Sequence, residues 1–243
     1  DQALSESRVK GIWKVRRAFR FGLRAGLFVM TAMVLWTSAP VAGPPHATHI
    51  YGIHSWGFGA GGLLRGKTGW TVEVVNTDSF PYDPTPSDIQ NMVNDGWTPI
   101  IRINKYFGQT VPASVSEYDA FALACADKVS QYGAHCNIWI IGNEVNMAWE
   151  RPGGPEHGEV ITPRLYAEAF RRCRDEIRRR PGHADDQIVI GAVAPWNVQT
   201  VYPDNPSGDW IIYFQQVLDL LADECAGIAL HTYARDADPA SIT

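Results

Sequence analysis

The stretch Asn137 to Trp149, NIWIIGNEVNMAW, decides how the rest of the chain is interpreted. Its first part, Ile138 to Gly142, is a short apolar run rich in β-branched residues, which is typical of a strand buried on both faces. The run ends abruptly, and Asn143 and Glu144 follow its glycine. An amide and a carboxylate therefore stand where a buried strand ends, although Gly-Asn-Glu is also the composition of an ordinary turn.

Similar apolar, β-rich runs recur on both sides of this stretch, and helix-like windows separate them. The windows carry apolar residues at three- and four-residue spacing, and Thr162 followed by Pro163 is a good start for one of them. The predicted strands are Thr48–Trp56, Trp70–Asn76, Thr98–Asn104, Asn137–Gly142, Gln187–Val193 and Ala226–His231. The predicted helices are Pro86–Asp95, Ser116–Tyr132, Pro163–Arg180 and Trp210–Ala222. Strands that alternate with helices predict a parallel sheet.

The spacing of these elements predicts a (β/α)8 TIM barrel of which about six βα units are present. A barrel of eight units needs about 250 residues, so six units need about 190. Ile50 to Thr243 spans 194 residues. A six-stranded doubly wound α/β fold fits the same strand count. In a barrel, the C-terminal ends of the strands meet at one open face, where Asn143 and Glu144 would share a cavity.

The Asn143-Glu144 pair at the end of a fourth strand resembles the (β/α)8-barrel clan of retaining glycoside hydrolases, which includes cellulases, mannanases and β-glycosidases. The resemblance covers about Ile50 to Thr243, and its other specific part is His231-Thr-Tyr233 at the end of the sixth strand. It implies that Glu144 is the general acid/base and that Asn143 contacts the sugar hydroxyl beside the scissile bond. It also implies that His231 and Tyr233 orient the nucleophile and line the subsite at the point of cleavage.

Other polar and aromatic residues follow predicted strands and are expected at the same open face. Arginine and asparagine side chains there would bind sugar hydroxyls, and flat aromatic faces pack against pyranose rings. Trp139 lies in the middle of a strand and is expected in the core instead. The predicted substrate-binding residues are Asn143, His231, Tyr233, His54, Trp56, Arg102, Asn104, Trp149 and Trp196.

Hydrolysis with retention needs a second carboxyl group, about 5 to 5.5 Å from the first. The resemblance places the nucleophilic glutamate at the end of a seventh strand, which we expect beyond Thr243. Glu73 lies within the second strand and is predicted to be structural. The implied activity is hydrolysis of O-glycosidic bonds in a β-linked glycan by double displacement, and the 243-residue chain alone is expected to be inactive.

The N-terminal residues 1–42 differ from the domain expected at 46–243. Arginines precede an apolar run from Ala25 to Trp36, and small residues follow up to Ala42. This order is that of a secretory signal, and the apolar run is shorter than the roughly 20 residues that span a bilayer. We expect cleavage between Ala39 and Ala42 and a secreted or extracytoplasmic protein, with a membrane anchor through residues 25–42 as the alternative.

Charge and cysteine content bound the possible partners. A net charge of −5 and a pI of about 5.8 argue against nucleic acid as a partner. The resemblance implies an oligo- or polysaccharide as the substrate. No metal-ligand spacing is evident, so neither a metal nor another cofactor is expected. Four cysteines, at positions 125, 136, 173 and 225, allow three pairings, and Cys125 with Cys136 is the first pair to test.

Two other functions remain open at this point. Gly61 to Thr68 matches the phosphate-loop pattern, and Gly57 to Gly62 matches a dinucleotide-binding pattern. A phosphate loop must open a helix, whereas the predicted strand at Trp70 follows almost at once, and no convincing helix is evident in this glycine-rich stretch. A nucleotide-binding α/β protein is therefore a remote alternative. A catalytically inactive carbohydrate-binding barrel is the other.

Overall fold

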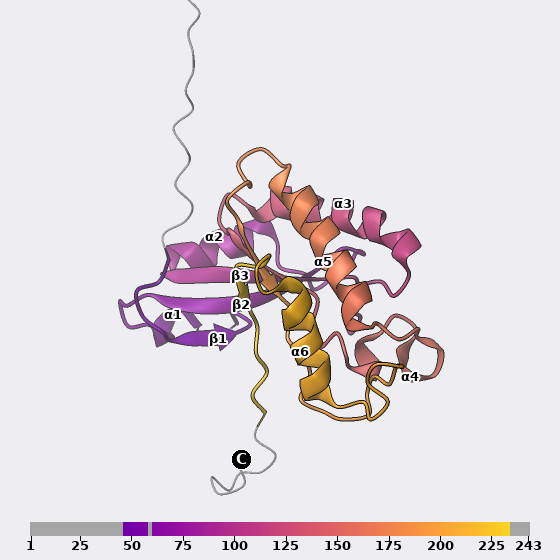
Figure 1. The fold of residues 1–243 in the computed structure, drawn as a ribbon. Coiled ribbons are helices and arrows are strands. Elements are labelled where there is room, and N and C mark those ends of the chain that lie inside the picture. Colours follow the sequence, from indigo (N-terminus) through magenta and orange to yellow (C-terminus); the bar gives the residue numbers. More distant parts are fainter. Residues whose placement is uncertain (1–45, 58–59, 234–243) are drawn as a thin grey trace, which may run out of the picture. The chain divides into compact units, whose positions relative to one another are not determined.

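The computed structural model describes residues 46–57 and 60–233. The predicted signal or anchor at residues 1–42 lies outside this part of the chain. The described residues form one sheet of six parallel strands with helices between them (Figure 1). The strands are β1 (Gly52–His54), β2 (Gly69–Asn76), β3 (Trp97–Asn104), β4 (Ile138–Ile141), β5 (Gln187–Ile190) and β6 (Gly227–Ile228).

The order of the strands decides between the two architectures that the sequence allows. Each strand pairs in parallel with the next one along the chain, from β1 to β6, without a reversal. A doubly wound sheet reverses its strand order at a switch point, whereas a (β/α)8 barrel does not. The prediction of a barrel with six βα units is therefore confirmed. Among the described strands, β1 and β6 have one neighbour each and form the edges.

The four long helices begin and end within two residues of their predicted bounds. The helices are α1 (Ala60–Leu63), α2 (Pro86–Asn94), α3 (Tyr118–Tyr132), α4 (Gly154–His157), α5 (Pro163–Arg178) and α6 (Trp210–Leu221), with 3-10 helices η1 (Val115–Glu117) and η2 (Ala148–Glu150). The Thr162 side chain caps α5 by accepting a hydrogen bond from the Leu165 backbone N–H. Thr85 and Asp88 form a capping box at the start of α2.

The glycine-rich connection between β1 and β2 differs from the prediction, because it contains the short helix α1. This helix ends at Leu63, and Thr68 is followed directly by β2 at Gly69. No helix therefore begins at Lys67 and Thr68, where a phosphate loop would need one. This geometry removes the support for the phosphate-loop interpretation. The match from Gly57 to Gly62 includes residues 58–59, which lie outside the described chain.

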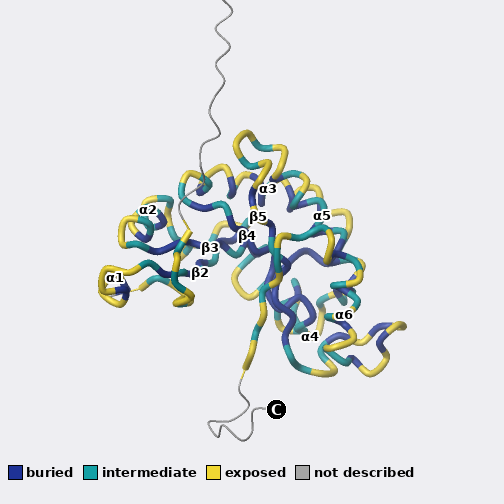
Figure 2. Tube along the Cα trace, turned by 60° about the vertical axis from the view of Figure 1, so that its left-hand side comes forward, coloured by how far each residue is buried: buried dark blue, intermediate teal, exposed yellow. Residues whose placement is uncertain are grey.

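The core lies between the sheet and the helices that cover its outer face, as the buried segments in Figure 2 indicate. Trp139 of β4 is fully buried, as predicted, and its indole N–H donates to Asp186 Oδ2 at 2.6 Å. His183 Nδ1 lies 2.8 Å from the same carboxylate oxygen. The helices α3 and α5 pack against each other through residues that include Cys125 and Cys173.

All four cysteines carry free thiols. Cys125 Sγ lies 3.8 Å from Cys173 Sγ, whereas Cys136 makes its contacts with the backbone carbonyls of Pro99 and Ile138. Of the three possible pairings, the geometry brings Cys125 next to Cys173 and away from Cys136, the partner named first for testing. Helix α3 turns its cysteine toward α5, away from the start of β4.

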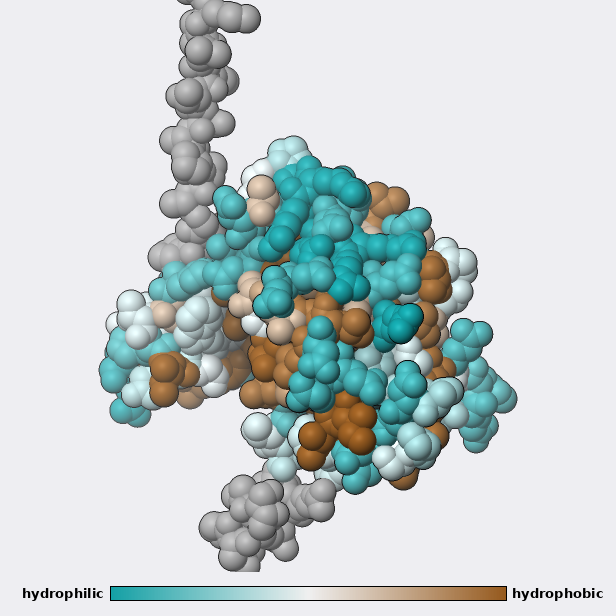
Figure 3. Space-filling model, in the orientation of Figure 1, coloured by the Kyte–Doolittle hydropathy of each residue, from teal (hydrophilic) through white to brown (hydrophobic). Residues whose placement is uncertain are grey.

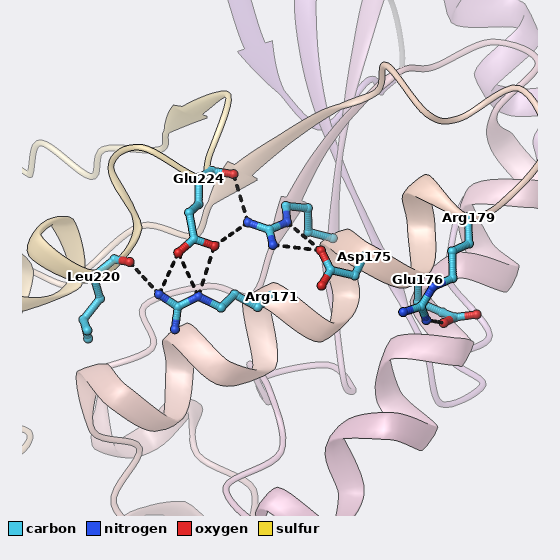
Figure 4. Close-up of polar contacts among 7 residues, drawn as sticks. Arg171, Asp175, Glu176, Arg179, Leu220 and Glu224 are labelled. Atoms are coloured by element: carbon cyan, nitrogen blue, oxygen red, sulfur yellow. Dashed lines mark hydrogen bonds and ion pairs between the residues drawn. The ribbon is translucent and has the colours of Figure 1, made fainter.

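Helix α5 is tied to the segment that leads into β6 by Glu224, which lies just after α6 (Figure 4). Arg171 binds Glu224 at 2.8 Å and also donates to the Leu220 carbonyl at 2.7 Å. Arg174 binds the other Glu224 oxygen at 2.5 Å. The two arginines thereby hold the connection that carries His231 and Tyr233.

Helix α6 is apolar along much of its length, and it leaves Ile211 and Ile212 exposed. Figure 3 shows apolar surface over this helix. Within residues 46–57 and 60–233, no helix combines the length and the apolar character that a membrane span requires.

Candidate active site

The end of β4 carries the candidate catalytic residues on a tight turn. Gly142 has a φ of +78°, and a Cβ at this position would lie 2.7 Å from Thr110 Oγ1. Only glycine fits this combination of backbone conformation and close approach. The next residue, Asn143, donates its backbone N–H to the same Thr110 oxygen at 2.9 Å. The turn therefore directs Asn143 and Glu144 to the C-terminal face of the sheet.

Glu144 has an unusual backbone and a nearly buried side chain. Its φ is +39°, and such a conformation costs a non-glycine residue about 1–3 kcal/mol. The backbone is held by a hydrogen bond from Met147 N–H to the Glu144 carbonyl at 2.6 Å. The carboxylate oxygen Oε1 lies 2.7 Å from His231 Nδ1 and accepts from the Tyr233 hydroxyl at 2.6 Å. Strain of this kind is concentrated at functional sites.

The surroundings of Glu144 favour its ionised form. Burial raises the pKa of this carboxyl, but hydrogen bonds from His231 and Tyr233, together with the charge of Arg102, outweigh the effect of burial. The pKa of Glu144 consequently lies below its ordinary value. Burial and the hydrogen bond to Glu144 raise the pKa of Tyr233 to about 12, so this hydroxyl keeps its proton and remains a donor.

A second carboxyl group, Glu150, lines the same cavity. Burial and the nearby charge of Glu144 raise the pKa of Glu150, although a hydrogen bond with the Asn143 side chain opposes this. Arg102 Nη1 donates to Asn143 Oδ1 at 2.6 Å and so fixes the orientation of the amide. The backbone carbonyl of Glu150 accepts from Thr110 N–H at 2.7 Å, which brings η2 back toward the strand end. The pKa values of the two carboxyl groups in this cavity are thus shifted in opposite directions: that of Glu144 is lowered and that of Glu150 is raised.

Six of the predicted site residues meet in one cavity of about 430 Å³. They are Glu144, Asn143, His54, Arg102, His231 and Tyr233. Burial and the charges of Arg102 and His231 lower the pKa of His54. The convergence follows from the parallel strands, since these residues come from the ends of β1, β3, β4 and β6.

The other four predicted residues lie outside this cavity. Trp56 and Asn104 line an adjoining cavity of about 750 Å³. Trp196 stacks on Tyr233, with ring centroids 6.0 Å apart and an interplanar angle of 14°. Trp149 is 69% exposed and lines neither of these cavities.

Glu73 lines the larger cavity, but its carboxylate is used within the protein. Its Oε1 accepts from the Trp56 backbone N–H at 2.5 Å and from the Thr71 hydroxyl at 2.7 Å. These bonds connect β2 to the segment that follows β1, which fits the predicted structural role. Within the described chain, no group of three or more His, Cys, Asp or Glu side chains is arranged to hold a metal ion.

Sequence reasoning missed Glu150 and the aromatic residues of the larger cavity, Phe80, Tyr82 and Phe107. Glu150 directly follows the stretch that ends at Trp149, but it ends the short 3-10 helix η2, in a connection without a periodic pattern. Its only signal is its closeness in sequence to Glu144. The aromatic residues follow β2 and β3, so the rule that strand ends form the open face could have found them.

No family model matches the sequence, and no curated protein matches it. Solved structures similar to the chain include three glycoside hydrolases. A fungal β-1,4-galactanase is 16% identical with a TM-score of 0.49, and the match covers 76% of this chain and 57% of that chain. A family 51 α-L-arabinofuranosidase from Bifidobacterium longum is 14% identical with a TM-score of 0.46, covering 84% and 49%. A family 39 glycoside hydrolase from Bacteroides cellulosilyticus WH2 is 14% identical with a TM-score of 0.40, covering 58% and 31%.

The chain thus spans from about a third to just over half of the length of these three structures. All three are glycoside hydrolases, which is the class that the sequence resembles. Because the identities and TM-scores are low, the fold assignment rests on the strand order and the site on its own geometry.

Proposed function

We propose that the protein is a glycoside hydrolase that cleaves a β-linked glycan with retention, and that Glu144 is its general acid/base. The observation that carries this proposal is the surroundings of Glu144. A buried carboxylate stands at the end of β4 on a strained backbone, and His231, Tyr233 and Arg102 converge on it within one cavity. Buried carboxylates with such specific partners are candidates for acid/base chemistry.

The proposed reaction has two steps that use Glu144 differently. In the first step, Glu144 gives a proton to the departing glycosidic oxygen while a second carboxylate attacks the anomeric carbon. In the second step, ionised Glu144 takes a proton from the water that releases the sugar. The lowered pKa of Glu144 matches the second step, because the carboxylate is then the base.

The first step needs Glu144 in its protonated form. A negatively charged nucleophile within about 5 to 5.5 Å would raise the pKa of Glu144, because two like charges disfavour each other's ionisation. We propose that this nucleophile lies beyond Thr243, as the resemblance implies. The negative charge of this nucleophile would shift Glu144 from the ionised form toward the protonated form, which the first step requires.

The neighbours of Glu144 are proposed to hold the sugar at the point of cleavage. Arg102 occupies the Asn143 oxygen, and one N–H of the amide hydrogen-bonds the Glu150 carboxyl group, which leaves the second N–H as a donor. A sugar hydroxyl beside the scissile bond would accept from it. Trp196, stacked on Tyr233, would add an aromatic surface at the edge of this subsite.

The direct test is the stereochemistry of hydrolysis by the complete gene product. We expect that proton NMR spectra of a β-linked oligosaccharide digest show the β-anomer of the new reducing end first. Early appearance of the α-anomer would mean inversion and would contradict the mechanism. Binding of oligosaccharides without any hydrolysis would favour the inactive carbohydrate-binding barrel.

Export is also proposed, from the order of basic, apolar and small residues before Ala42. N-terminal sequencing of the exported protein is expected to begin after Ala39. A mature N-terminus upstream of Ala25 would instead favour a membrane anchor.

A further inference from the structure

The cavity of about 750 Å³ that adjoins the Glu144 site has an aromatic wall built from two loops. Phe80 stacks on Phe107, with ring centroids 5.0 Å apart and an interplanar angle of 11°. Tyr82 and Tyr106 meet the Phe80 ring edge-on, at 5.5 and 5.6 Å. Tyr82 and Phe107 remain 84% and 66% exposed. Mutual stacking thus holds large aromatic faces toward solvent along the cavity.

Several residues that line this cavity have hydrogen-bonding capacity that no other described residue uses. Four of the lining side chains have a buried polar atom without a partner in the described chain: Trp56 Nε1, Asn76 Oδ1, Arg102 Nε and Asn104 Oδ1. Asn76 and Asn104 are 1% and 3% exposed. A buried polar group left unpaired costs about 1–3 kcal/mol, so a ligand that satisfies these atoms would gain affinity. Two are donors and two are acceptors, which suits hydroxyl groups, because each hydroxyl both donates and accepts.

The charges around this cavity select against acidic sugars. Its lining contains the carboxyl groups of Glu73, Asp83, Asp88 and Glu150. Arg102 is its only Lys or Arg side chain among the described residues, and it already donates to Asn143. A uronic acid would therefore meet four carboxyl groups and a single cation. Neutral sugars fit this lining better.

The larger cavity adjoins the proposed reaction centre. His54, Arg102, Asn143 and Glu150 line both cavities. A glycan with one unit beside Glu144 would therefore extend along the aromatic wall. The volume of the larger cavity falls within the range of about 300–1,000 Å³ that is usual for ligand sites.

We infer that the larger cavity binds the non-reacting units of a neutral β-linked oligosaccharide, with Tyr82 and Phe107 stacking on the sugar rings and Asn76, Asn104 and Trp56 binding their hydroxyls. This inference rests on the proposed function, which places the scissile bond at Glu144. It deepens that function by making the substrate an oligomer or polymer of neutral sugars. A glycoside with a single sugar ring would use the Glu144 cavity alone.

The test compares binding of saccharides of increasing length by isothermal titration calorimetry. The probes are neutral β-1,4-linked saccharides of glucose, mannose, xylose and galactose, each with one to six units, and the protein is the complete gene product. We expect affinity for at least one series to rise with length. The Tyr82→Ala/Phe107→Ala double variant should lose about tenfold in affinity for its longest member, equivalent to ~1.4 kcal/mol.

The matched control is Tyr51→Ala. Tyr51 is also an exposed aromatic residue, at 57%, but it precedes β1 and lies beside Lys67, outside both cavities. This variant should bind as the native protein does. Because Tyr82 and Phe107 are exposed, their truncation leaves the core unchanged, and a thermal unfolding curve checks this.

Three results would overturn the inference: no member of the panel binds, affinity does not depend on length, or the double variant binds as tightly as Tyr51→Ala. Hydrolysis of an aryl β-glycoside by the native protein is measured separately, because it needs only one sugar ring beside Glu144. Hydrolysis combined with any of these three results refutes the cavity assignment and leaves the proposed function standing. Length-dependent binding that is lost in the double variant, without any hydrolysis, supports the cavity assignment and refutes the catalytic one.

Discussion

Tyr166 of α5 supports the strand end that carries the catalytic turn, and its hydroxyl group can be removed cleanly. The side chain is fully buried. Its hydroxyl donates to the Ile141 carbonyl at 2.9 Å and accepts from the Gly191 N–H at 2.7 Å. The hydroxyl therefore bridges the ends of β4 and β5 directly beneath Gly142. We predict that Tyr166→Phe destabilises the protein through the loss of both bonds.

The expected cost follows from the groups that are left behind. Each buried polar group without a partner costs about 1–3 kcal/mol, and here one acceptor and one donor lose their partner. Partial pairing between these two groups recovers some of the loss, so we expect a decrease of about 2–4 kcal/mol in the free energy of unfolding. A domain has about 5–15 kcal/mol in total, so the variant should still fold.

The assay is urea unfolding followed by tryptophan fluorescence, with Tyr213→Phe as the control. Tyr213 is equally buried, but its hydroxyl makes a single bond, to the Ile161 carbonyl at 2.8 Å. Its loss should cost about 1–2 kcal/mol. A Tyr166→Phe variant that loses no more stability than Tyr213→Phe would show that the bridge between β4 and β5 contributes nothing beyond an ordinary buried hydrogen bond.

Three further predictions concern charge and thiols. Arg171 and Arg174 lower the pKa of Glu224 to about 2, so the stability that they provide is present above its unfolded pKa of about 4.3 and is lost as pH falls toward 2. Glu224→Gln should therefore lower the free energy of unfolding by about 1 kcal/mol at pH 7, and its stability should decline less steeply than that of the native protein as pH falls. Parallel curves of stability against pH would argue against a contribution from the ion pairs. The pKa of Glu150 is raised, so the folded state binds the extra proton and native stability falls as pH rises above about 4.3. The free energy of unfolding of Glu150→Gln, relative to that of the native protein, should therefore increase as pH rises from 4 to 7. A difference in unfolding free energy that stays constant over this pH range would refute the prediction. Cys225 should react first with a thiol reagent in the native state, because the other three thiols are buried; equal rates for all four would contradict the packing.

The regular part of the fold could be predicted because its signals are local and periodic. The strand β4 reads as an apolar run that stops at Gly142, and the structure has it there. The strands β5 and β6 are shorter than predicted. Buried apolar residues such as Ala192 and Val193 continue past the end of β5, because loops cover them after the ladder has ended. Hydropathy indicates burial and does not indicate which residues pair.

The candidate site was predictable only where it consists of strand ends. Glu144, His231 and Arg102 come together because parallel strands bring their C-terminal ends to one face. Loop residues obey no such rule. Trp149 and Glu150 are neighbours in sequence, yet η2 leaves the tryptophan exposed and turns the glutamate into the cavity. That choice depends on contacts such as Thr110 N–H with the Glu150 carbonyl, which link distant parts of the chain.

The role of Glu144 is tested most directly by the leaving-group dependence of Glu144→Gln in the complete gene product. A glutamine cannot protonate the departing oxygen, and an activated aryl group leaves without that proton. We predict that kcat/KM falls about 10²- to 10⁴-fold on a β-linked oligosaccharide and much less on a dinitrophenyl β-glycoside. Glu156→Gln, which removes a carboxylate whose side chain is 85% exposed, should not change the ratio of the two rates. Equal losses on both substrates for Glu144→Gln would contradict the account.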